Sequence, residues 1–74
     1  MKLKKHQRRM IKEYNRLRKR IDKLDKFLDE HGDKVDDEMF RLMRAQYFAM
    51  CAYEGILRMR INIELAYLNR DPAF

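Results

Sequence analysis

The sequence is poor in the residues that build turns, disulfides and metal sites. Among 74 residues there are two glycines, one proline and one cysteine. So few turn-forming residues exclude a fold of several strands joined by tight turns. The lone Cys51 excludes a disulfide within the chain, and a free thiol among apolar neighbours fits a reducing cytoplasm. His6 and His31 do not form a zinc-binding spacing, so no metal or other cofactor is expected.

The sequence also lacks a long apolar run. Its least polar segment, AQYFAMCAYEGIL at 45–57, contains one charge, Glu54, and is too short to cross a bilayer. Arg58 and Arg60 follow this segment, and no apolar segment follows the basic N-terminal region as it would in a signal peptide. We therefore expect a cytoplasmic protein without a membrane partner.

What the chain does contain is the apolar periodicity of two long helices. In the first part, residues three, four or seven positions apart form one stripe: Leu3, Met10, Tyr14, Leu17, Ile21, Leu24 and Leu28. His31 and Gly32 are typical of a helix end with glycine in the position just beyond it. Asp36 is typical of an N-cap, and Pro72 prevents any later helix. The chain is thus predicted to be all-α.

The predicted fold is an antiparallel hairpin of two helices, at about 3–31 and about 37–69. It forms a single helical domain, 1–74, with a short C-terminal tail at 70–74. Matching the apolar stripes of the two helices end to end places Glu54 opposite Tyr14. A hydrogen bond from the phenol would satisfy this carboxylate, and the alternative is that Glu54 leans out to a nearby arginine.

The second helix is apolar on the side away from the hairpin seam as well. This second face contains four alanines and several large apolar residues, and the candidate interface is Ala45, Phe48, Ala49, Ala52, Ile56, Met59 and Ile63, with Ala66 beyond it. A chain this short usually needs a partner subunit, a metal or a disulfide to fold robustly. We therefore predict a homo-oligomer, either a dimer forming a four-helix bundle or a larger ring. The alternative is a monomer with a sticky surface.

The net charge of +6 is unevenly distributed. Residues 1–23 contain eleven Lys/Arg and two acids, whereas residues 24–40 contain two Lys/Arg and seven acids. Like charges also lie four residues apart along the first helix, for example Lys12 and Arg16, which destabilises a helix. An anionic partner would relieve this repulsion. The alternative is a solvated face that keeps the oligomer soluble.

A more specific pattern lies on one edge of the hairpin. Three residues of the second helix are seven positions apart, and the first helix contributes arginines to the same edge: Gln46, Tyr53 and Arg60 with Arg9, Arg16 and Arg20. Guanidinium groups match phosphate oxygens in geometry, and a tyrosine ring can stack on a base. These six residues are the candidate ligand site, repeated at an interface between copies. The alternative is that Arg60 pairs with Glu13 or Glu64 and that Tyr53 only packs.

Two stretches, RMIKEYNRLRKRIDKLDKFL at 9–28 and LMRAQYFAMCAYEGILRMRI at 42–61, resemble a family of small phage-encoded helical-hairpin proteins with no settled activity. The matching positions lie in both helices: Glu13, Ile21, Lys23, Leu24, Phe27, Gln46, Ala49, Met50, Tyr53, Arg60 and Ile61. The resemblance implies phage origin and hence the host cytoplasm. Small phage proteins of this kind often disarm host defences by binding a host protein or sequestering a nucleotide signal.

A second stretch, LRKRIDKLDKFL at 17–28, is similar to the opening of the helical chorismate mutases. That resemblance implies a substrate-binding role for Arg18. The enzymes continue their first helix further and add a third helix, whereas Gly32 ends the first helix here and no third helix is expected. The heptad-like register explains the same residues equally well, so this enzyme is a remote alternative.

These observations predict a binding protein and not an enzyme, because no nucleophile–base pair, metal cluster or phosphate loop is present. The leading hypothesis is an oligomeric phage-type protein that sequesters a nucleotide-like anion in basic pockets between protomers and so counteracts host immunity. Such an anion would be a cyclic or ADP-ribose-type signal. The alternative is that the basic first helix binds nucleic acid or a host protein directly, as an anti-CRISPR-like or regulatory inhibitor. Lys12 and Lys19 are expected outside the candidate ligand site.

Overall fold

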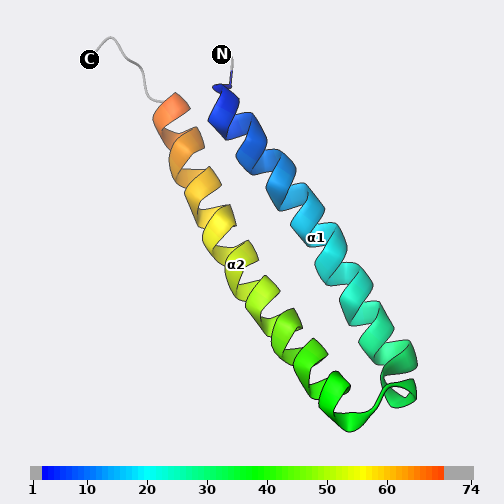
Figure 1. The fold of residues 1–74 in the computed structure, drawn as a ribbon. Coiled ribbons are helices and arrows are strands. Elements are labelled where there is room, and N and C mark those ends of the chain that lie inside the picture. The colour runs from blue at the N-terminus through cyan, green and yellow to red at the C-terminus, as the bar shows by residue number, and fades with distance from the viewer. Residues whose placement is uncertain (1–2, 70–74) are drawn as a thin grey trace.

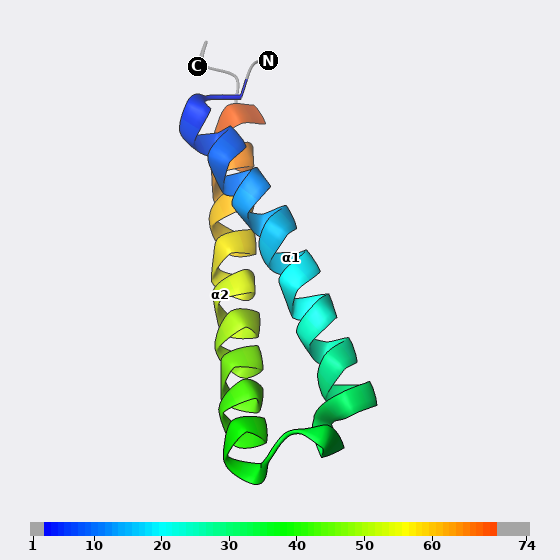
Figure 2. The ribbon, with the colours of Figure 1, turned by 45° about the vertical axis from the view of Figure 1, so that its right-hand side comes forward.

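The computed structural model describes residues 3–69, with side chains up to residue 66, and these residues form a helical hairpin. Helix α1 spans Lys5–His31, a 3-10 turn spans Gly32–Lys34, and helix α2 spans Asp37–Asn69. The two helices run side by side in opposite directions, as both ribbon views show (Figures 1 and 2). Both predicted helices are confirmed, and no strand occurs within the part of the chain that is described. The predicted tail at 70–74 lies outside the described residues.

Helix α1 begins at Lys5, two residues later than the periodicity indicated. Lys4 has an extended backbone, with φ −70° and ψ 160°, and acts as the N-cap residue. Its backbone N–H donates to Oε1 of Gln7 at 2.7 Å. This bond is half of a capping box, in which the third residue of the helix reaches back to the cap. The start of the helix is therefore set by Gln7 and not by the apolar residue Leu3.

The conformation of Gly32 differs from the one predicted for a glycine just beyond the end of the first helix. A glycine that ends a helix usually adopts a left-handed conformation, but Gly32 has φ −60° and ψ −29° and continues into the 3-10 turn. The chain becomes extended only at Val35. Glycine is required here for space, because a Cβ atom on Gly32 would lie 2.6 Å from Cε2 of Phe40. The beginning of α2 thus packs directly on the end of α1.

We expect Gly32→Ala to lower the free energy of unfolding by about 1 kcal/mol. Overpacking against Phe40 costs about 1–3 kcal/mol, which outweighs the roughly 0.5–1 kcal/mol gained by removing a glycine from helical backbone. Gly55→Ala is the control, since a Cβ atom there meets nothing within 4 Å. This control should gain about 0.5–1 kcal/mol. Urea denaturation measures both, and a gain for Gly32→Ala would contradict the steric role of the site.

A narrow core joins the two helices. Its buried members are Met10, Leu17, Ile21 and Leu57, and the partly buried residues around them are Tyr14, Tyr47, Met50, Cys51 and Ile61. Four residues of the predicted stripe, Met10, Tyr14, Leu17 and Ile21, belong to this core, which confirms the central part of the seam. The predicted cap of α2 is confirmed as well, because the Met39 N–H donates to Oδ1 of Asp36 at 2.7 Å. Neither described helix is long and apolar enough to span a bilayer.

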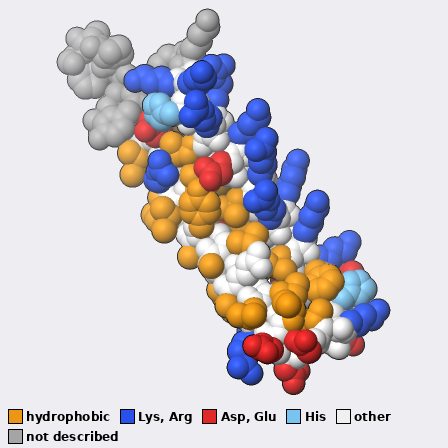
Figure 3. Space-filling view, in the orientation of Figure 1, with side chains coloured by type: hydrophobic (Ala, Val, Ile, Leu, Met, Phe, Trp, Pro, Cys, Tyr) orange, Lys and Arg blue, Asp and Glu red, His pale blue; other side chains and the backbone are white. Residues whose placement is uncertain are grey.

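The outward face of α2 is uncovered in the single chain. The seven predicted interface residues are three alanines and four large apolar residues. All seven are exposed. Leu42, which the prediction omitted, extends the same face and is 60% exposed. In the space-filling view, apolar side chains follow α2, basic side chains follow α1, and acidic ones gather at the turn (Figure 3). Assembly through this face stays a prediction.

A polar cluster joins the helices near the open end of the hairpin. Nε2 of Gln7 donates to Oε2 of Glu64 at 2.9 Å, and Nε2 of His6 lies 3.3 Å from the same oxygen. The hydrogen bond from Gln7, followed by that from His6, lowers the pKa of Glu64, while partial burial opposes the shift. The ionised form of Glu64 is therefore the one that stabilises the folded chain.

This cluster predicts a loss of stability in acid. Because the pKa of Glu64 is lower in the folded state, its contribution is present above the unfolded pKa of about 4.3 and is lost as the pH falls through the folded value. Glu64→Gln should therefore be less stable than the wild type at neutral pH, and the difference should shrink below about pH 4.3. Urea denaturation at several pH values measures this, with Asp29→Asn at an exposed position as the control. A difference independent of pH would refute the assignment.

Candidate anion-binding groove

A groove runs along one edge of the hairpin, between the first half of α1 and the middle of α2. Its volume is about 400 Å³. We call it the basic groove, and its lining residues are Arg9, Lys12, Glu13, Arg16, Leu17, Arg20 and Tyr53. Six of the seven come from α1. Because they are spaced three and four residues apart, the helix places them in a row on neighbouring turns.

Tyr53 is fixed in this groove by Glu13. The Tyr53 hydroxyl donates a short hydrogen bond to Oε1 of Glu13 across the two helices. This bond, followed by partial desolvation, raises the pKa of the Tyr53 phenol, while the nearby Arg60 opposes the shift. The phenol therefore remains a protonated donor at neutral pH. An aromatic ring with a defined position thus stands between the guanidinium groups.

The arginines of the groove have no carboxylate partner in the described structure. The ion pairs between described residues are His6 with Glu64 and His31 with Glu30, and neither includes an arginine. Glu13 is bonded to Tyr53 and Glu64 to Gln7, so the predicted alternative, in which Arg60 pairs with one of these acids, is not what the structure shows. The guanidinium groups are free to bind an anion, because all of these arginines are exposed.

The structure brings together four of the six predicted site residues. Arg9, Arg16, Arg20 and Tyr53 line the basic groove, whereas Gln46 and Arg60 do not line it within one chain. Arg60 is nevertheless close enough to affect the pKa of Tyr53. That these residues bind a ligand remains a prediction.

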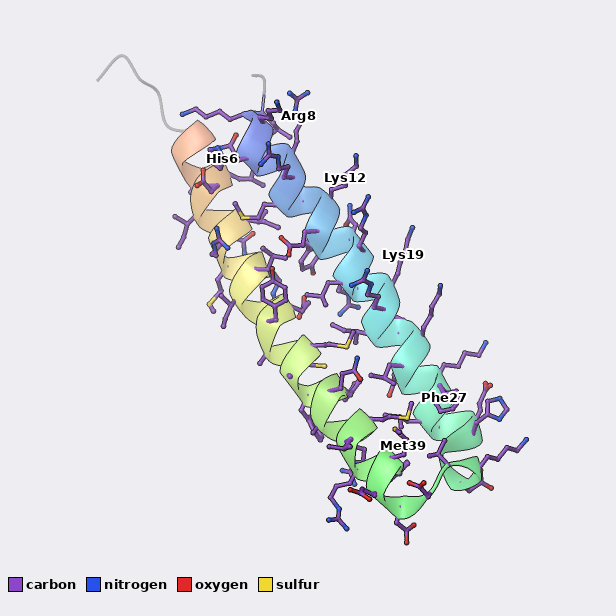
Figure 4. The ribbon with its side chains drawn as sticks, viewed as in Figure 1. His6, Arg8, Lys12, Lys19, Phe27 and Met39 are labelled. Atoms are coloured by element: carbon purple, nitrogen blue, oxygen red, sulfur yellow. The ribbon has the colours of Figure 1, made fainter. Side chains whose placement is uncertain are left out.

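Sequence reasoning misplaced one lysine. Lys12 was expected outside the site, but it lines the basic groove. It lies one residue before Glu13 on α1, at the border between the groove and the outer face of the helix. Lys19 does not line the groove and points away from α2 (Figure 4). Sequence spacing alone does not show which of the two lysines lines the groove, since Lys12 and Lys19 both lie on the broad basic side of α1.

The predicted partner of Glu54 is confirmed, and it removes this acid from the site. Glu54 is buried, and hydrogen bonding to its carboxylate raises the pKa of the Tyr14 phenol. The burial of Glu54 argues against the alternative, in which this side chain leans out to an arginine. Among the described residues, no group of His, Cys, Asp and Glu side chains could hold a metal ion. The basic groove thus offers positive charge, hydrogen-bonding groups and one aromatic ring.

A family model described as Sequestin matches residues 4–63, which include all of α1, most of α2 and the whole lining of the basic groove. The chain belongs to the Sequestin family. This name indicates a sequestering role, which means binding rather than catalysis, and no enzyme family is indicated. Neither the curated proteins nor the solved structures contain a match to the chain.

Proposed function

We propose that the protein sequesters an anionic, nucleotide-like ligand in the basic groove, at an interface between copies of the chain. The observation that carries this proposal is a row of arginines without carboxylate partners beside a tyrosine that is fixed in position. The family name supports the general role of sequestration.

The groove offers a separate contact for each part of a nucleotide. Arg9, Arg16 and Arg20 can grip phosphate oxygens, and two of them can do so at once because they lie on successive turns. The ring of Tyr53 offers a stacking surface for a base. Glu13 repels a bare anion but accepts hydrogen bonds, which favours a ligand that also carries ribose hydroxyls or an amino group.

The biological setting is part of the same proposal. The resemblance to phage-encoded proteins favours action in the cytoplasm of an infected host. A protein that holds a cyclic or ADP-ribose-type defence signal without changing it removes the signal from its receptor. Such action requires tight, stoichiometric binding and no turnover, which fits a groove without a nucleophile–base pair or a metal-binding group among the described residues.

Calorimetry on the wild-type protein tests the proposal. The panel contains ADP-ribose, a cyclic ADP-ribose, cyclic dinucleotides, AMP and inorganic phosphate. We expect saturable binding of at least one dinucleotide-sized ligand, weaker binding of AMP, and no binding of phosphate alone. The recovered ligand should be chemically unchanged. No binding across the panel, or equal binding of phosphate and the nucleotides, would contradict the proposal.

A second candidate function is supported by a second hollow. This hollow lies on the outer face of α1, and its lining is Lys5, Arg8, Arg9, Ile11, Lys12 and Asn15. Figure 4 shows Arg8 and Lys12 on the side of α1 that is away from α2. A row of exposed cations along a helix suits the phosphate backbone of nucleic acid. Binding of this kind would weaken steeply with salt, whereas a compact ligand in the basic groove would lose less affinity.

A further inference from the structure

The uncovered face of α2 has the spacing of a coiled-coil seam. Its members alternate three and four residues apart, and we call them the outer stripe: Leu42, Ala45, Ala49, Ala52, Ile56, Met59, Ile63 and Ala66. Its four large members are 53–60% exposed. A continuous exposed apolar stripe of this length is typical of a surface that binds another protein chain.

The order of large and small residues in the outer stripe determines how two copies can pair. Reversing the stripe against itself matches every large side chain with an alanine: Leu42 with Ala66, Ala45 with Ile63, Ala49 with Met59, and Ala52 with Ile56. These pairs also join the two kinds of seam position that face each other in antiparallel coiled coils. A parallel pair would instead stack alanine on alanine and isoleucine on isoleucine, which leaves voids and overpacked layers.

Charge favours the same orientation. Residues 1–23, at the open end of the hairpin, have a net charge of +9, whereas residues 24–40, at the turn, have a net charge of −5. An antiparallel pair places the acidic turn of each copy at the same end as the basic opening of the other. A parallel pair would bring two basic ends together and two acidic ends together, which is repulsive at moderate ionic strength.

We propose that a second copy of the chain packs antiparallel on the outer stripe and completes the basic groove. The two-fold axis then passes beside Tyr53, next to the partner's Tyr53. The partner's Arg60 lies beside Gln46, so the two predicted residues that do not line the groove of a single chain join it in the pair. This last step rests on the proposed ligand-binding function, whereas the pairing itself does not.

The shape of the pair follows from the positions of the two apolar faces on α2. The hairpin seam and the outer stripe are roughly 150° apart on the side of the helix that carries Tyr53. Both α1 helices therefore lean toward that side, and the two grooves open on the same concave face. A ligand with several phosphates could then be gripped by arginines of both copies.

Disulfide cross-linking in a Cys51→Ala background tests the orientation. The variants are Ala45→Cys alone, Ile63→Cys alone, and both together, since these two exposed positions do not contribute to the hairpin core. Within one helix the two positions are roughly 27 Å apart, and a disulfide requires Cα atoms closer than about 7 Å. An antiparallel pair therefore gives a covalent dimer only for the double variant. Ala49→Cys with Met59→Cys repeats the test at a second layer.

Three outcomes would be decisive, and none of them involves a ligand. Covalent dimers of both double variants, with monomers of all single variants, support the antiparallel pair. Covalent dimers of each single variant would show parallel pairing, and monomers throughout from folded protein would show no pairing, so both overturn the proposal. For the completed groove, Arg60→Ala in the cross-linked dimer should lower affinity for the nucleotide found by calorimetry about tenfold. Unchanged affinity would overturn that part alone.

Discussion

Replacing Arg16 with alanine is expected to reduce nucleotide affinity about ten- to a hundredfold. Arg16 lies in the middle of the basic groove, in the row of arginines opposite Tyr53. A hydrogen bond to a charged group contributes about 1.5–3 kcal/mol, and the loss of one guanidinium contact to a phosphate should cost this much. Arg20→Ala, on the next turn, should have a similar effect. Calorimetry with the nucleotide that the wild-type protein binds measures both.

The matched control removes positive charge from the same helix outside the groove. Lys19→Ala combined with Lys26→Ala should change nucleotide affinity less than about threefold, because neither residue lines the basic groove and surface charge is screened by salt. Lys12 is unsuitable as a control because it lines the groove. Equal losses in the control and in Arg16→Ala, fading together in high salt, would point to nucleic acid binding along α1 and would refute the groove.

The second large effect is expected on assembly. Ala52→Glu and Ala49→Glu each place a carboxylate in the centre of the outer stripe, where pairing would bury it in both copies. Removing an unpaired charge from water costs several kcal/mol, so the dissociation constant of the dimer should rise by at least about a hundredfold. Sedimentation at micromolar concentration should then show monomer or unfolded chain for these variants, and the proposed dimer for the wild type.

Asn15→Glu is the control for this change. It adds the same charge at an exposed position on α1, away from the outer stripe, and should leave assembly unchanged. Circular dichroism separates loss of pairing from loss of helix. If the wild-type protein itself sediments as a folded monomer at micromolar concentration, self-association through α2 is wrong.

The sequence predicted the features that depend on periodicity. The 3-4 spacing of Met10, Leu17 and Ile21 was enough to place the seam, and this register in turn placed Glu54 opposite Tyr14. The same periodicity gathered the arginines of α1 on the edge that carries Tyr53. These predictions hold because a helix converts sequence spacing into direction with little freedom.

Features that depend on one atom's approach to another could not be predicted in this way. The conformation of Gly32 follows from how closely the Phe40 ring packs, which no local signal encodes. The cluster of His6, Gln7 and Glu64 joins polar residues that have no periodic pattern. The lining of the groove by Lys12 depends on where a long side chain bends, and spacing gives only the direction in which its Cβ atom points.

The buried Glu54, beside the half-buried Tyr14, affects the choice between alternative folds of the chain. Helix α2 has apolar residues on two opposite faces, so hydrophobicity alone allows either face to meet α1. If α2 turned its other face to α1, Glu54 would lose Tyr14, and Glu64 and Tyr53 would lose Gln7 and Glu13. An acid in the seam stabilises the hairpin less than a leucine at the same position would. It destabilises the alternative fold, in which the other face of α2 packs on α1, more than a leucine would. These polar contacts thus decide which side of α2 packs on α1 and which side stays uncovered in the single chain.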